Sequence, residues 1–257
     1  MILNEKKGVA YYTFPNFSNQ PGIAHGIFTR NGGNSTGPYE GLNISFGVGD
    51  DKKNVIKNRN IISSIFNDRN IVSARQVHGT DGIIFKEGED SVFREDSKEP
   101  LVGDALISNK NQMLFMIKVA DCQPVMVYDP KQRVAANIHS GWRGSVKNII
   151  GHTIRIMGDK FNCKSSDLIA GIGPSLGPCC AEFVNYKKEI PEAYWTYKNQ
   201  DNYFDFWAMS KDQLCNAGVL PGNIHLSNIC TKCHTDRFFS YRGEGTTGRF
   251  AAVIGLV

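Results

Sequence analysis

The chain has 257 residues, of which 41% are hydrophobic and 21% charged, so it can bury a substantial core, and its formal net charge is only +4. The mild charge and the lack of a dense lysine or arginine block argue against a nucleic-acid partner, and no apolar run reaches the about 18 residues of a membrane span. Seven cysteines without an export signal predict reduced thiols and a cytoplasmic protein.

Three helices are expected in chain order. The first covers 54–66, where apolar residues recur at helical spacing after Asp51 as a cap. The second covers 145–157, with Ser145 as its cap and one apolar face. The third lies around 209–218.

Apolar runs predict strands along the chain, so the overall pattern is mixed α/β. The strands are expected over 70–78, 113–122, 124–130, 133–140, 168–173 and 249–257. The polar stretch 86–100 is expected to be a solvated excursion between strands and is too short for a domain linker. The alternation of strands and helices therefore predicts one α/β domain over residues 1–257.

Three residues with metal-binding side chains fall at predicted strand ends: His78, Cys122 and His139. A strand and a turn separate Cys122 from His139, so their convergence is easy, whereas the approach of His78 depends on how its strand docks. Two imidazoles and one thiolate leave a tetrahedral zinc with one open position, the arrangement of a catalytic site. The alternative is that His139 is a hydrogen-bonded histidine beneath the turn and Cys122 a small buried hydrophobe.

Seven sequence blocks resemble the YfiH-type, laccase-domain family, whose members are also called purine nucleoside phosphorylases and peptidoglycan editing factors. In chain order they are TRNGGNSTGPYEGLNISFGVGDD (29–51), RQVHG (75–79), DALIS (104–108), ADCQPV (120–125), HSGWRG (139–144), GPSLGPCCAEF (173–183) and FFSYRGEGTTGRFA (238–251). Their number and order make the resemblance specific over nearly the whole chain. It implies a single YfiH-like domain, a layered α/β/β/α sandwich with mixed sheets, in which His78, Cys122 and His139 bind zinc.

Arginines near glycines suggest a phosphate site. Arg30 lies beside Gly32-Gly33, and within the resemblance it is the leading phosphate contact, with Asn43 as a polar pocket residue. Arg143 lies near the start of the helix after His139, where an anion is also favoured; equally, it can pin the turn.

Other polar residues have open roles. Asp121 is expected to orient a ligand imidazole or to pair with Arg143. The adjacent Cys179 and Cys180 are expected to be packing residues, with a nucleophile as the alternative. The motif CTKCHTD (230–236) is expected to be a strand-end turn, with an accessory metal or redox pair as the minor reading.

The resemblance implies a zinc-dependent purine nucleoside enzyme acting on small molecules. Phosphate would attack C1′ of adenosine, inosine or methylthioadenosine, giving the free base and (methylthio)ribose 1-phosphate, with an accompanying adenosine deaminase activity. One alternative is a copper-dependent polyphenol oxidase, since the same ligands accommodate copper, although six histidines without a His-x-His pair are few for a multi-copper cluster. The other is a metal or cysteine hydrolase that edits peptidoglycan peptides. The sequence does not define the oligomeric state.

Overall fold

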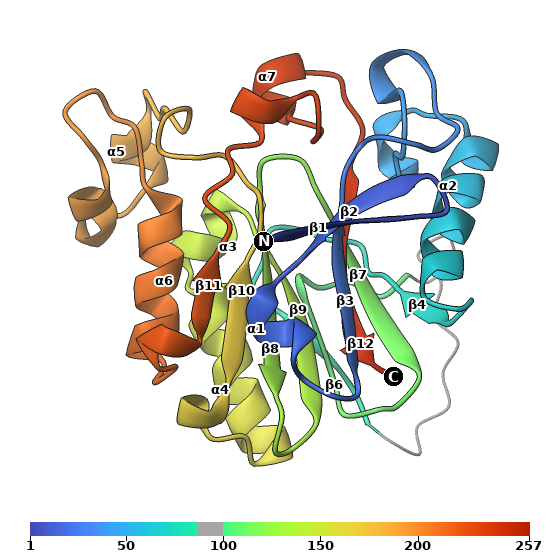
Figure 1. The fold of residues 1–257 in the computed structure, drawn as a ribbon. Coiled ribbons are helices and arrows are strands. Elements are labelled where there is room, and N and C mark those ends of the chain that lie inside the picture. The colour runs from blue at the N-terminus through green and yellow to red at the C-terminus, as the bar shows by residue number, and fades with distance from the viewer. Residues whose placement is uncertain (87–99) are drawn as a thin grey trace.

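Two six-stranded β-sheets pack face to face, with helices on the outer side of each (Figure 1). The structure is a computed structural model and describes residues 1–86 and 100–257. One sheet has the strand order β1-β2-β3-β12-β7-β4 and the other β11-β10-β8-β9-β6-β5. Most neighbours are antiparallel, but β4–β7, β5–β6 and β10–β11 are parallel, so both sheets are mixed.

The elements have the following bounds. The strands are β1 Ile2–Lys6, β2 Val9–Thr13, β3 Ile23–Phe28, β4 Asn70–Val72, β5 Gly82–Phe85, β6 Ala105–Ser108, β7 Met113–Val119, β8 Gln123–Asp129, β9 Val134–Ser140, β10 Ile169–Ile172, β11 Ile224–Leu226 and β12 Phe250–Leu256. The α-helices are α1 Pro15–Ser18, α2 Lys52–Ile65, α3 Trp142–Val146, α4 Ile149–Phe161, α5 Tyr186–Glu189, α6 Phe206–Asn216 and α7 Tyr241–Glu244.

A shared apolar core joins the two sheets. Ile117 of β7 and Ile254 of β12 belong to the same buried cluster as Met126 and Tyr128 of β8. The apolar face of α2 covers the outside of the first sheet, and α4 covers the outside of the second (Figure 1). The expected α/β/β/α sandwich with mixed sheets is therefore confirmed.

Several expected elements match the structure closely. The helix expected over 54–66 is α2, and its cap is confirmed because the Asp51 side chain accepts from the Lys53 amide at 2.8 Å. The strand expected over 133–140 is β9, whose seven residues are all buried. Buried, mainly apolar runs also give β7, β8, β10 and β12 near their expected places.

The helix expected over 145–157 is observed as α4, Ile149–Phe161, but its expected start at Ser145 is wrong. The chain forms two helices there, because Asn148 adopts a left-handed conformation (φ 57°) and caps α4 by accepting from the Gly151 amide. Ser145 lies inside α3, where its hydroxyl donates to the Gly141 carbonyl at 3.1 Å.

The strand expected over 70–78 is too long. The strand β4 ends at Val72, and the chain then crosses from the edge of the first sheet to β5 at the edge of the second. His78 lies on this crossing with φ 60°, not in a strand. Within the stretch 86–100, residues 87–99 lie outside the described residues.

None of the helices in residues 1–86 and 100–257 is both long and apolar enough to cross a membrane.

A buried histidine makes the stability of the fold depend on pH. His25 of β3 is 6% exposed, its Nε2 accepts from the Phe14 amide at 2.8 Å, and burial lowers its pKa from 6.5 to about 4. The unfolded chain therefore binds a proton that the folded chain excludes, so this contribution is complete above pH 6.5 and is lost as pH falls towards 4.

We predict that His25→Gln removes this pH dependence. Between pH 7 and 4.5 the wild type should lose about 2–3 kcal/mol of unfolding free energy more than the variant does. Urea denaturation of both proteins at the two pH values measures the difference. Parallel loss in both proteins would show that His25 does not titrate in this range.

Candidate metal centre and its pocket

The structure brings His78, Cys122 and His139 together where the chain passes between the two sheets. His78 lies on the crossing from β4 to β5, and Cys122 lies on the turn from β7 to β8. His139 is the penultimate residue of β9, which pairs with β8 so that His139 lies opposite Pro124. Crossings and a strand end therefore supply the three side chains.

Their donor atoms have separations that suit one metal ion. All three lie within 4.8 Å of one another, and His78 Nε2 is 3.8 Å from Cys122 Sγ. Tetrahedral zinc with ordinary bond lengths needs nitrogen–sulfur separations of about 3.5 Å. The residues present therefore fit a zinc ion, while their role as ligands remains a prediction.

Asp104 positions both histidines, and the sequence did not single it out. Its fully buried carboxylate accepts from the backbone amides of Val77, His78 and Gly79 at 3.2, 2.9 and 2.8 Å. It also lies 2.8 Å from His139 Nδ1. That contact leaves Nε2 as the nitrogen available to an ion, the usual carboxylate–histidine–metal arrangement.

Cys122 and His139 also shift one another's pKa. Burial raises the pKa of the Cys122 thiol, but His139 and His78 outweigh burial and lower it to about 6. Burial likewise lowers the pKa of His139, but the Cys122 thiolate and Asp104 raise it to about 9. Both shifts favour the Cys122 thiolate, which is the form that binds a metal.

Gly141 leaves the room that the three side chains need. A Cβ at this position would lie 2.6 Å from His78 Cδ2 and 3.1 Å from Cys122 Sγ. Since φ of Gly141 is −77°, an ordinary value, the constraint is steric and not conformational. The glycine in HSGWRG therefore serves the approach of His78 to Cys122.

A cavity of about 550 Å³ opens beside this centre. His78 and Cys122 lie in its lining, and four aromatic residues also contribute: Trp142, Phe183, Phe206 and Tyr241. This volume is ordinary for a small-molecule site, and aromatic walls suit a flat heterocycle.

Asp121 connects the loops around this cavity. It has φ 82°, and its carboxylate accepts from Thr231 Oγ1, Ser240 Oγ and the Arg242 amide at 2.6, 2.7 and 2.6 Å. Its carboxylate therefore binds loop residues. The structure shows neither of the two expected roles, orienting a ligand imidazole or pairing with Arg143. Asp104, not Asp121, contacts the imidazole of His139, a candidate ligand.

The three residues expected to bind substrate lie in different places. Arg143 lines the cavity, and its guanidinium lies 4.2 Å from the centre of the Trp142 ring. Arg30 lines a separate cavity, where it pairs with Glu244 at 2.7 Å and stacks on Phe239 at 4.3 Å.

Asn43 is fully buried. Its side-chain amide donates to Asp50 at 2.8 Å and its oxygen accepts from the Arg249 amide at 2.8 Å. Arg30 and Asn43 are therefore absent from the described lining of the cavity beside the metal centre, and Arg143 is present.

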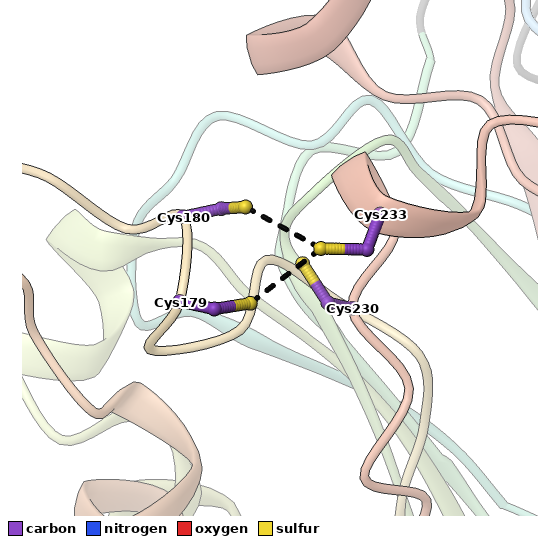
Figure 2. A group of neighbouring side chains, drawn as sticks. All are labelled: Cys179, Cys180, Cys230 and Cys233. Atoms are coloured by element: carbon purple, nitrogen blue, oxygen red, sulfur yellow. Dashed lines mark hydrogen bonds between the residues drawn. The ribbon is translucent and has the colours of Figure 1, made fainter.

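Cys179 and Cys180 lie outside the cavity lining and face Cys230 and Cys233 (Figure 2). This placement does not favour either of them as a nucleophile for a substrate in the cavity.

Comparison with known proteins finds similarity over nearly the whole chain. The family model described as "Multi-copper polyphenol oxidoreductase laccase" matches residues 24–257. The protein named "Purine nucleoside phosphorylase YlmD" from Geobacillus stearothermophilus is 32% identical over 247 residues, covering 91% of this chain and 90% of the relative. A Bacteroides thetaiotaomicron protein named "Purine nucleoside phosphorylase" is 31% identical, with coverages of 95% and 94%.

Solved structures agree in fold. The crystal structure of YlmD from Geobacillus stearothermophilus superposes with a TM-score of 0.87 at 30% identity, covering 98% of this chain and 97% of the other. That of the Bacillus licheniformis hypothetical protein YfiH also gives 0.87, at 25% identity, with 99% of both chains covered.

We predict that Cys122→Ala abolishes metal binding at the centre, because it removes the thiolate ligand. Asp104→Asn should weaken binding by about 10–100-fold without abolishing it, because it removes the orienting carboxylate and leaves the ligands in place. Competition with a chromophoric chelator measures both affinities.

Cys163→Ala is the matched control, because Cys163 is a half-buried thiol outside both cysteine-containing groups. Unchanged binding in Cys122→Ala, or equal loss in Cys163→Ala, would contradict the assignment.

Proposed function

The chain belongs to the family described as multi-copper polyphenol oxidoreductase laccase. We propose that this protein is a metal-dependent purine nucleoside phosphorylase. In the proposed reaction a phosphate oxygen attacks C1′ of adenosine, inosine or methylthioadenosine while the bond from C1′ to N9 breaks. The proton that the attacking phosphate loses ends on the departing base. The products are the free base and (methylthio)ribose 1-phosphate. The names of the relatives at about 30% identity support this choice.

The observation that carries the proposal is the aromatic cavity that opens beside the His78, Cys122 and His139 centre. The purine would lie against Trp142 and Phe183, whose rings are 6.0 Å apart and nearly perpendicular. Arg143 would bind phosphate, since its guanidinium is exposed at the cavity and stacks on Trp142.

His78, Cys122 and His139 would hold zinc, since one thiolate and two imidazoles suit that ion and leave one position open. When bound, zinc would supply a Lewis acid and a means of activating water at neutral pH, which also accounts for the proposed adenosine deaminase activity. The chain's own contribution is positional. Asp104 holds the two histidines, Asp121 holds the loops of the wall, and the aromatic rings exclude water from the base.

The family description also suggests a second activity, that of a copper oxidase. The residues of the centre do not favour it. A cluster that reduces dioxygen needs many histidines, whereas this chain has six, and two of them reach the centre. His25 is occupied by its hydrogen bond in β3, and residues 87–99 contain no histidine. A single ion therefore suits the described site better than a multi-copper cluster.

We predict that the zinc-loaded protein converts inosine to hypoxanthine and ribose 1-phosphate only when phosphate is present. Product analysis by chromatography with and without phosphate measures this directly. Conversion of adenosine to inosine without phosphate would demonstrate the deaminase activity. Oxidation of phenols or cleavage of muropeptides, with no nucleoside turnover, would overturn the proposal in favour of a laccase or a peptidoglycan hydrolase.

We also predict that Arg143→Ala raises the KM for phosphate by about ten-fold or more, because a charge-assisted contact contributes about 1.5–3 kcal/mol. Metal content should not change. Arg30→Ala is the matched comparison: its loss of the Glu244 ion pair should lower stability and leave the phosphate KM nearly unchanged. The opposite outcome would restore Arg30 as the phosphate contact.

A further inference from the structure

Four cysteines from two distant segments converge outside the cavity. Figure 2 shows the Cys179 and Cys180 side chains pointing towards those of Cys230 and Cys233. The Cys233 sulfur lies 3.6 Å from both the Cys179 and Cys180 sulfurs, and all four sulfurs lie within 4.8 Å of one another.

The backbone holds the two segments in place. Ser175 and Cys230 form a parallel bridge, in which the Ser175 amide donates to Ile229 and the Thr231 amide donates back to Ser175. The Gly177 amide also donates to Cys230 Sγ at 3.3 Å. Amide donors to a sulfur stabilise its thiolate form.

We propose that Cys179, Cys180, Cys230 and Cys233 bind a second metal ion, a structural zinc coordinated by four thiolates. Tetrahedral zinc with ordinary zinc–sulfur bonds separates its sulfurs by about 3.8 Å, close to the spacing of this cluster. Four protein ligands would leave no open position, which is typical of a structural site. The proposal is independent of the nucleoside reaction.

Packing and disulfide bonding explain the cluster less well. Cys179 and Cys233 are exposed, so the cluster is not a set of buried hydrophobic side chains. One sulfur, that of Cys233, has two equally close partners, whereas a disulfide joins only two sulfurs. Metal coordination accommodates all four at once.

The ion would fasten the wall of the cavity. The first cysteine pair precedes Glu182 and Phe183, and the second pair precedes Tyr241 and Arg242, all four of which line the cavity. Arg242 already joins the two segments by donating to the Glu182 carbonyl at 2.8 Å. A shared zinc would hold them together more strongly than this exposed hydrogen bond.

The test uses Cys122→Ala, in which the first centre has lost its thiolate, so that zinc retained by the chain reports on the cluster. Elemental analysis of protein purified without chelators should give two zinc ions per wild-type chain and one in Cys122→Ala. X-ray absorption at the zinc edge of that variant should show sulfur ligands only. Adding Cys230→Ser and Cys233→Ser should remove the remaining zinc, while adding Cys163→Ala should not.

Nitrogen ligands on the retained zinc, or full retention after Cys230→Ser and Cys233→Ser, would overturn the proposal. A cobalt titration of metal-free wild-type protein covers the case in which the multiple variant does not fold. Two equivalents of cobalt should each produce thiolate charge-transfer absorption, the four-thiolate site more strongly. Absorption that ends after one equivalent, or a protein mass showing a disulfide within the cluster, would also overturn it.

Discussion

The buried carboxylate of Asp104 is the constraint on which the rest of the candidate active site depends. A buried charge is tolerated only where donors surround it, and here three consecutive backbone amides and one imidazole do so. The same contacts hold His78 in a left-handed conformation that no strand could impose. One side chain thus connects the crossing after β4 with the end of β9, and the cavity forms beside that connection.

The family resemblance implied the layered fold, and the residue patterns predicted the elements with strong local signals. α2 and β9 match because a side-chain cap and a continuous apolar run are local features. The strand over 70–78 and the helix over 145–157 differ from the structure for separate reasons. The strand is cut short where the chain crosses between the sheets, whereas the helix is divided by a local feature, the left-handed Asn148 that caps α4.

The candidate ligands were predictable because their side-chain types are rare and chemically specific, whereas their supports were not. Asp104 is 35 residues from His139 in sequence, and nothing local marks it except its place at the start of an apolar strand. Arg30 illustrates the reverse case. Its glycine-rich surroundings suggest an anion site, but the Glu244 carboxylate that occupies its guanidinium is 214 residues away. The convergence of the two cysteine pairs is equally non-local.

The register of the β8–β9 hairpin has a consequence for assembly fidelity. Pro124 lies opposite His139, and a slip of one residue would turn that imidazole to the other face of the sheet. A misregistered chain could keep its secondary structure and much of its buried surface, yet it could not present the three donors to one ion. Content of the proposed metal ion would then distinguish correctly assembled copies from misregistered ones with similar backbone spectra.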